Sequence, residues 1–265
     1  MTTQVTGQTP AIAAPANTSP GSINPIPGNP KIYRLDGNPR KIKIKMGLYG
    51  RSGVGKTRLA TTIGKHFKTF LISSERSNST IVSHPEFAAI RNNLDIMDIE
   101  SWDDVKSAFD FIVGNQDRYE WVIVDSLTDI NKRVIDDVQT SSKEETLSMR
   151  QWGQVGSRME KLIRYMRDLR TNVLFVCLSS GEKNELTGEI CQYPSLTGRL
   201  KEEMPAYLDI NGYMYTAESK TEPGKVDRWI TFVNTPKAVA KDRFDKLNYE
   251  PSDMSSILKK LGLID

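Results

Sequence analysis

The chain has 265 residues, of which 38% are hydrophobic and 26% charged, a balance typical of a globular protein with enough chain to bury a core. Its formal net charge of +3 does not by itself indicate a nucleic-acid partner, and its two cysteines are too few for a disulfide framework or a cysteine zinc site. No apolar run is long enough to span a bilayer, and no secretory signal is apparent. We therefore expect a cytoplasmic protein.

The first 30 residues differ from the rest of the chain. They contain no Asp, Glu, Lys or Arg, and they hold six of the 13 prolines. Such a segment cannot bury enough apolar surface to offset the entropy lost on ordering, so we expect a disordered tail over 1–30. A tether that binds a partner is the alternative interpretation. The remaining residues, 31–265, are expected to form one domain.

From residue 41 onward, short apolar segments alternate with helical patterns. A period-2 alternation predicts a strand over 41–48, and a Gly-rich turn separates it from a helix over about 56–67. Further strands are expected over 69–73, 94–99, 121–124 and 173–178. Helices are expected after Ser101, which is placed to cap one with Asp104, and over 151–170. This alternation predicts an α/β fold with a mostly parallel sheet.

The pattern changes after residue 180. Turn signals separate two segments with strand character, 212–217 and 228–233, which predicts an antiparallel extension of the sheet. A last helix is expected over 252–261, ending at Gly262.

The strongest chemical signal is a match to the P-loop pattern G-x-x-x-x-G-K-[ST]. Its residues are Gly50, Arg51, Ser52, Gly53, Val54, Gly55, Lys56 and Thr57, and Arg58 follows. Glycines let backbone N–H groups approach phosphate oxygens, Lys56 is expected to reach the β- and γ-phosphates, and the Thr57 hydroxyl is expected to ligate Mg²⁺. The motif follows a predicted strand and opens a predicted helix, so we expect a nucleoside triphosphate and Mg²⁺ to bind here.

Two carboxylates follow predicted strands. Asp125 ends the apolar segment 121–124, and the carboxyl ends of parallel strands form the edge where ligands bind in open α/β sheets. We expect Asp125 to hold Mg²⁺, with an ordinary turn cap as the alternative. Glu75 follows the strand over 69–73 and is a candidate general base for the attacking water; an exposed loop glutamate is the alternative.

The order of these segments resembles the ATPase core of the RecA recombinase family. The segments are Gly50–Thr57, Phe70–Glu75, Trp121–Ser126 and Val173–Leu178. The likeness is greatest to the small phage-encoded RecA-core ATPases associated with single-strand annealing and recombination, and it covers roughly Lys41 to Ile264. The resemblance implies a RecA-like P-loop fold, ATP as the nucleotide, and Glu75 as the residue that activates water.

A second segment, Ala240–Phe244, is similar to the Lys-x-Arg element of RadA- and DnaB-type ATPases. There the basic pair reaches the γ-phosphate of the neighbouring subunit. The resemblance implies that Lys241 and Arg243 act in trans, with Arg243 as the arginine finger, and that the protein forms a homo-oligomer or filament. A solvated basic turn is the alternative.

The chain departs from the family at Ser179-Ser180. RecA-type proteins carry a Gln at the corresponding strand end, where it senses the γ-phosphate and relays it to a DNA-binding loop. Serine is shorter and forms fewer such contacts. Coupling between ATP and DNA is therefore expected to be absent or differently built.

Single-stranded DNA is the partner that the resemblance implies, and a single-strand-binding protein is a further one. The family's two DNA loops correspond here to about 139–150 and 180–201. Candidate phosphate contacts in them are Arg150, Lys183, Arg199 and Lys201. Acidic residues are interspersed in both segments, so neither is clearly basic.

Three hypotheses follow. The first is a Mg²⁺-dependent ATPase that acts on single-stranded DNA in phage recombination, annealing or repair, in the cytoplasm of a bacterial host. The second is a non-hydrolytic annealing module that uses ATP as a conformational clip. The third is another P-loop class, such as a helicase loader or a small-molecule kinase.

Overall fold

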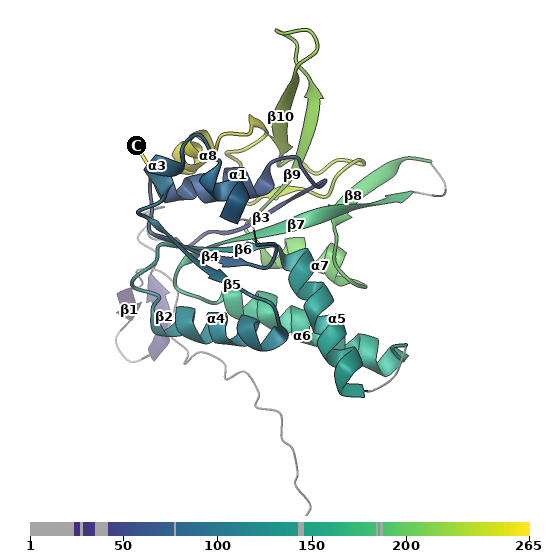
Figure 1. Cartoon of the computed structure of the whole chain (residues 1–265). Helices are drawn as coiled ribbons and strands as arrows, with labels where there is room; N and C mark the ends of the chain where they lie inside the picture. The colour runs from purple at the N-terminus through teal and green to yellow at the C-terminus, as the bar shows by residue number, and fades with distance from the viewer. Residues whose placement is uncertain are drawn as a thin grey trace, which may run out of the picture.

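The computed structural model describes residues 24–26, 29–34, 42–76, 78–142, 146–183, 185 and 188–265. A ten-stranded sheet forms the centre, with strand order β12-β10-β9-β3-β7-β6-β4-β5; β11 pairs with β9, and β8 pairs with β7 (Figure 1). Among the described residues, no helix has both the length and the apolar character needed to cross a membrane.

Six neighbouring strands of this sheet run parallel. They are β5 (Leu94–Asp98), β4 (Thr69–Ser73), β6 (Trp121–Asp125), β7 (Asn172–Lys183), β3 (Lys45–Gly50) and β9 (Ile210–Glu218). In β3, β4 and β6 every residue is buried, as expected for strands covered by helices on both faces. The predicted α/β fold with a mostly parallel sheet is confirmed.

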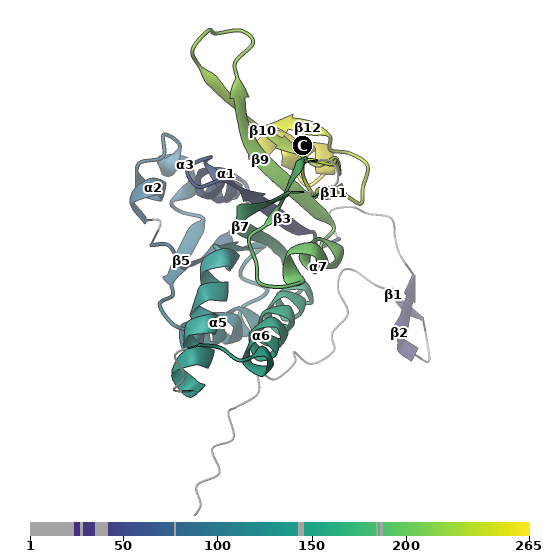
Figure 2. The same ribbon diagram turned by 90° about the vertical axis from the view of Figure 1, so that its right-hand side faces the viewer.

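Helices cover both faces of the sheet (Figures 1 and 2). On one side lie α4 (Trp102–Gly114), α5 (Leu127–Ser142), α6 (Met149–Arg167) and α7 (Leu200–Tyr207). On the other lie α1 (Lys56–Thr61), the 3₁₀ helix η2 (Thr62–Lys65), α2 (Asn78–Val82), α3 (Phe87–Ile90) and α8 (Met254–Leu261). Strand β6 shows the division, because Val122 and Val124 pack in the first core and Trp121 and Ile123 in the second.

Three antiparallel strands lie on the β9 side of the sheet, and a fourth pairs with the end of the central strand β7. They are β10 (Val226–Thr231), β11 (Lys241–Asp242), β12 (Tyr249–Pro251) and β8 (Ile190–Pro194). The expected extension is present, but the segment 212–217 lies in β9, which pairs parallel with β3 on one side and antiparallel with β10 on the other. Strand β9 is therefore the junction between the parallel core and the extension.

Some predicted boundaries shift for local reasons. The strand predicted over 41–48 begins only at Lys45, and the helix predicted over 56–67 ends at Thr61 and continues as η2. The Thr61 hydroxyl donates to the carbonyl of Thr57, and the Thr62 hydroxyl to that of Leu59, contacts that favour the end of a helix. Helix α4 begins as predicted, with Ser101 and Asp104 forming a capping box, and α8 ends at Gly262 with φ 77°.

The expectation of a disordered segment over 1–30 is wrong in part. Strands β1 (Asn24–Ile26) and β2 (Asn29–Arg34) pair antiparallel as a separate two-stranded sheet. The connecting dipeptide in the sequence is Pro27-Gly28, a strong turn signal that composition alone does not weigh. Residues 1–23 lie outside the described residues.

Lys45 is an unusual charge in the core. It is 5% exposed, and its ammonium donates to the carbonyls of Leu169 (2.8 Å) and Thr171 just after α6. Burial lowers the pKa of Lys45 from 10.5 to about 7, although Asp209 opposes the shift.

This shift predicts a pH-dependent stability. Because the folded-state pKa lies below the unfolded value, the unfolded state binds more protons between about pH 7 and 10.5, and the free energy of unfolding rises with pH in that window. The slope contributed is at most about 1.4 kcal/mol per pH unit. Urea unfolding of the native protein and of Lys45→Met at pH 7, 8 and 9 measures it. We expect the difference between the two proteins to grow in favour of the native protein; a difference independent of pH would contradict the assignment.

Candidate functional site

The P-loop connects β3 to α1, and its glycines are fixed by geometry. A Cβ at Gly50 would lie 2.3 Å from the carbonyl oxygen of Met214 in β9, so a side chain has no room there. Gly53 and Gly55 have φ angles of 76° and 104°, which L residues with side chains rarely adopt. Val54 is buried in the core beneath the loop and anchors it. The glycine geometry and the buried Val54 thus define the conformation of the turn.

Lys56 lies inside this turn. Its side chain is buried, and its ammonium donates to the carbonyls of Gly50 at 3.0 Å and Arg51 at 2.9 Å. Burial lowers the pKa of Lys56, while Asp125 and Glu75 raise it. The two carboxylates thus favour the charged form at a position where it can meet an anionic phosphate.

Thr57 and Asp125 meet as the sequence predicts. The Thr57 hydroxyl donates to Asp125 Oδ2 at 2.6 Å, and Asp125 is 1% exposed at the end of β6. A hydroxyl and a carboxylate this close suit Mg²⁺, which takes oxygen ligands and usually keeps waters and substrate phosphates in its shell. The described residues contain no group of three or more His, Cys, Asp and Glu that could hold a metal alone. A hydroxyl and one carboxylate supply only part of such a shell, so the pair fits Mg²⁺ whose remaining ligands are waters and phosphates.

Glu75 lies next to Asp125 because two serines join their strands. The Ser74 N–H donates to the carbonyl of Asp125 at 2.8 Å, and the Ser126 N–H donates to Ser74 Oγ at 2.9 Å. The Ser126 hydroxyl then donates to Glu75 Oε1 at 2.6 Å. Glu75 is exposed at the carboxyl edge of the sheet, and one of its oxygens is held by a neighbour.

Sequence reasoning missed two residues that support Glu75. One is Ser126, and the only sequence feature that pointed to it was its position directly after Asp125. The other is Arg133 in α5, which donates to the carbonyl of Ser74 at 2.9 Å and also to that of Glu100. Arg133 forms an ion pair with Asp129 at 3.0 Å, and this i,i+4 spacing was the available signal. Helix α5 therefore fixes the backbone that precedes Glu75.

Lys241 and Arg243 lie at the opposite edge of the sheet. They lie level with the start of β9, where Lys241 pairs with Asn211. The P-loop instead follows Gly50, which pairs with Met214 further along β9. The Lys241 ammonium donates to the carbonyls of Pro205 and Leu208, and Arg243 pairs with Asp209 at 2.9 Å. Within one chain the structure does not bring them to Lys56, so their action in trans stays a prediction.

The two segments expected as DNA loops contain regular structure. Helix α5 continues to Ser142, residues 143–145 lie outside the described residues, and α6 begins at Met149. The loop expected over 180–201 is wrong, because β7 runs to Lys183 and forms a hairpin with β8 before α7 begins. Ser179 pairs with Pro194 in this hairpin, and its buried hydroxyl oxygen has no hydrogen-bond partner among the described residues.

The four candidate DNA contacts differ in their freedom. Arg150, Lys183 and Arg199 are exposed, in the first turn of α6, at the end of β7 and just before α7. Lys201 forms an ion pair with Glu182, and its ammonium lies 5.8 Å from the ring centre of Tyr193. Lys201 is thus already neutralised within the chain.

Comparison with known proteins finds one family model whose matched range contains the P-loop and both carboxylates. A family model described as an AAA domain matches residues 42–244. A search of curated proteins found no match.

Solved structures that are similar to the chain include the following two. One is a prototypical ATPase from the type III secretion system of pathogenic bacteria, with 15% identity and a TM-score of 0.46 over 65% of this chain and 52% of that one. The other is a KaiC-like protein from Pyrococcus horikoshii OT3, with 12% identity and a TM-score of 0.43 over 78% and 84%. The chain spans about half the length of the secretion ATPase. The family match, in contrast, covers most of the chain together with its P-loop, Asp125 and Glu75, and on this match the chain belongs to the AAA domain family.

Proposed function

We propose that the protein is a Mg²⁺-dependent ATPase that acts on single-stranded DNA in recombination, annealing or repair. The observation that carries the ATPase part is the 2.6 Å contact between Thr57 and Asp125, with Lys56 and Glu75 beside it. Each of the four residues has the chemistry that phosphoryl transfer to water requires. Membership of the AAA domain family supports the same activity.

The residues divide the work as follows. The P-loop backbone and Lys56 bind the phosphates; Thr57 and Asp125 would hold Mg²⁺, which would neutralise phosphate charge when bound. Glu75 accepts a proton from water as the water oxygen attacks the γ-phosphorus and the bond to the ADP oxygen breaks. Ser126 binds Glu75 Oε1, which leaves Oε2 to take the proton.

The substitution that tests this assignment is Glu75→Gln, with Lys56→Ala beside it. We expect Glu75→Gln to bind ATP normally and to lower kcat by about 10²–10⁴-fold, because the amide cannot accept the proton. Lys56→Ala should weaken nucleotide binding itself. Phosphate release with Mg²⁺-ATP, with and without single-stranded DNA, measures both effects.

Glu120→Gln is the matched control, since Glu120 is exposed just before β6, at the edge of the sheet opposite Glu75. Normal hydrolysis by Glu75→Gln would contradict the role of Glu75 as the base. Stimulation by single-stranded DNA in the native protein would support the DNA part of the proposal.

The non-hydrolytic clip is the second candidate function, and Ser179-Ser180 favours it. These serines stand where the resemblance places a phosphate-sensing Gln, and Ser179 pairs in the β7–β8 hairpin instead. If ATP acts only as a clip, Glu75→Gln leaves strand annealing unchanged. An annealing assay on the same variants therefore separates the two functions.

We also propose that Lys241 and Arg243 complete the site of a neighbouring copy. Arg243→Ala should then lose most hydrolysis, since an arginine finger is worth about 10³–10⁵ in kcat. Mixing Arg243→Ala with Lys56→Ala should restore part of the activity, because some interfaces then pair an intact P-loop with an intact Arg243. Lys237→Ala, at an exposed position nearby in sequence, is the control. Full activity of Arg243→Ala, or no recovery on mixing, would contradict action in trans.

For DNA, the exposed residues Arg150, Lys183 and Arg199 are the proposed phosphate contacts. Replacing one by Ala should reduce the slope of log K against log salt by about 0.7 for single strands, because one fewer counterion is released. Lys201→Ala should change the slope less, since Glu182 already pairs with Lys201. Titration of a labelled oligonucleotide at several salt concentrations measures this slope. Lys161→Ala, exposed on α6, is the control, and an equal loss in it would show a general charge effect.

A further inference from the structure

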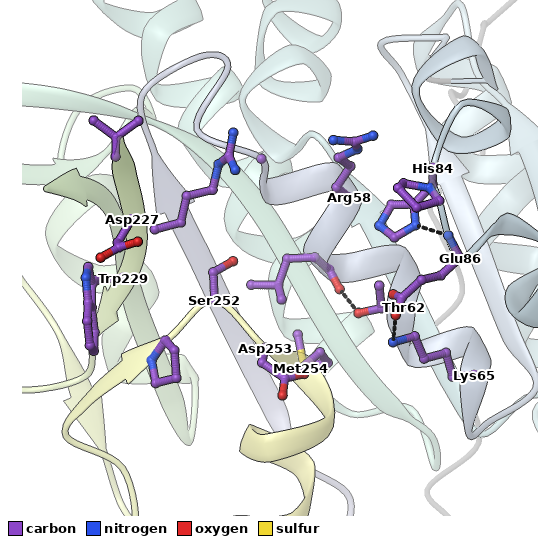
Figure 3. A pocket seen from close by; sticks show the side chains of 16 residues that line it. Arg58, Thr62, Lys65, His84, Glu86, Asp227, Trp229, Ser252, Asp253 and Met254 are labelled. Carbon is purple, nitrogen blue, oxygen red and sulfur yellow. Dashed lines mark hydrogen bonds and ion pairs between the residues drawn. The ribbon is translucent and has the colours of Figure 1, made fainter. Parts of the chain in front are cut away.

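An aromatic cavity lies on the side of β9, β10 and β12 that corresponds to the sheet face covered elsewhere by α4–α7. Its volume is about 520 Å³, within the range usual for ligand sites. Tyr213 and Tyr215 of β9 and Tyr249 of β12 line it, together with Pro236, and no residue of a helix does. The cavity in Figure 3 lies on the opposite face, beside α1, and the two cavities share no lining residue.

The register of three strands brings the tyrosines together. Tyr213 pairs with Thr231 in β10, and Thr231 pairs with Tyr249 in β12. Residues directly opposite one another on antiparallel strands point to the same face of a sheet. Tyr215 follows at period two, and its ring lies 5.9 Å from that of Tyr213 at an interplanar angle of 16°. Tyr249 is 53% exposed, so the three rings form an aromatic surface that is open to solvent.

The wall opposite these rings is fixed by hydrogen bonds. The Tyr49 hydroxyl lies 2.9 Å from the carbonyl oxygens of Gln192 and Val239 and can donate to either. The Gln192 N–H donates to the carbonyl of Lys237 at 2.8 Å, and the Val239 N–H donates to that of Gln192 at 3.1 Å. These bonds join the segment 235–239 to β8, so the wall that carries Pro236 is already in place for a ligand.

The cavity offers apolar contact and little net charge. Among the described residues that line it, Lys237 and Glu189 carry the only charges, and these are opposite in sign. A polyanion such as a nucleic acid therefore gains no net attraction here. Grooves lined by aromatic rings are instead typical binding sites for proline-rich segments, whose extended conformation loses little entropy on binding.

The chain itself contains a segment with this chemistry. Its first 30 residues hold six prolines and no Asp, Glu, Lys or Arg. Within them the longest run without a polar side chain is Pro10–Ala16, with the sequence PAIAAPA. Two prolines and Ile12 supply apolar surface, and the absence of charge matches the near-neutral lining of the cavity.

The connection to the sheet is long enough for this segment to reach the cavity. Tyr213 lies level with Tyr49 of β3, seven residues after Ile42, and Tyr249 lies three strands away from β3. The cavity is therefore roughly 27 Å from residue 42, at about 3.3 Å per residue and about 4.8 Å per strand. Residues 17–23 and 35–41, without the β1–β2 hairpin between them, span roughly 46 Å when extended. Such a tether gives an effective concentration on the order of millimolar, so a weak affinity is sufficient.

We propose that the aromatic surface formed by Tyr213, Tyr215 and Tyr249 binds the segment Pro10–Ala16 of the same chain. The inference goes beyond the proposed function and does not depend on ATP hydrolysis. Tyr213 and Tyr215 also line a second cavity, of about 350 Å³, together with the P-loop residues 51–54. The bound segment therefore lies next to the loop that holds the phosphates.

Photocross-linking of the full chain tests this docking. Tyr249 is replaced by the photoreactive residue p-benzoylphenylalanine, and the cross-linked peptides are identified by mass spectrometry. We expect cross-links to residues 10–16 of the same chain. The same replacement at Trp152 is the matched control, because Trp152 is also a half-exposed aromatic residue but lines a separate cavity between α6 and α7. It should give no cross-link to this segment.

Two charge substitutions test the chemistry of the contact. Ile12→Asp places a charge inside the apolar run and should lower the yield of cross-links from position 249 by about tenfold or more, because burying an unpaired carboxylate is costly. Ser22→Asp adds the same charge outside the run and should leave the yield unchanged. A loss with Ile12→Asp and none with Ser22→Asp supports the inference.

Three results would overturn it. The first is an equal yield in the two charge variants, or cross-links from position 249 only to other parts of the chain. The second is a mixed cross-link between isotope-labelled and unlabelled chains, which would assign the surface to a second copy. The third is a cross-link to an added single-stranded oligonucleotide in place of residues 10–16, which would assign the surface to nucleic acid. Each of these results leaves the proposed ATPase intact, since none of them measures hydrolysis.

Discussion

The hydrogen bond from Thr57 Oγ1 to Asp125 Oδ2 joins two segments that are 68 residues apart in the chain. It is possible only because β3 and β6 end at the same edge of a parallel sheet, separated by β7. The buried strands fix where that edge lies. The turn that the P-loop glycines allow brings Thr57 back toward it. The other parts of the site, Lys56 beneath the loop and Glu75 at the end of β4, take their positions from the same edge.

Much of this site could be predicted because its signals are local. The P-loop is a contiguous pattern, and Asp125 follows a run of buried apolar residues, so both were found without knowledge of the fold. Helix α5 was missed although its apolar residues, Leu127, Ile130, Val134 and Val138, recur at helical spacing. The β7–β8 hairpin was missed although Thr187-Gly188 is a turn signal between its strands, because the exposed residues 181–183 and Ile190 show no apolar alternation.

Contacts between distant segments were beyond prediction. Nothing in the sequence around Arg133 shows that its guanidinium binds the carbonyl of Ser74, and nothing around Arg228 shows that it runs along Gly55. The positions of Lys241 and Arg243 also depend on the register between β11 and β9. In each case the contact partner depends on how helices and strands pack together. Patterns in a single sequence do not show that packing.

The place of β3 in the sheet has a consequence for how the protein folds. Its neighbours are β7, where Lys45 pairs with Val173, and β9, where Met46 pairs with Ile210. The strand that carries the P-loop therefore gains its sheet partners only from residues more than 120 positions later. Closing such long loops costs entropy before any contact compensates for it, which makes parallel sheets slow to form. The P-loop, the most evident motif in the sequence, thus follows a strand that is paired only after distant parts of the chain have folded. A correctly formed P-loop therefore indicates that the sheet is complete.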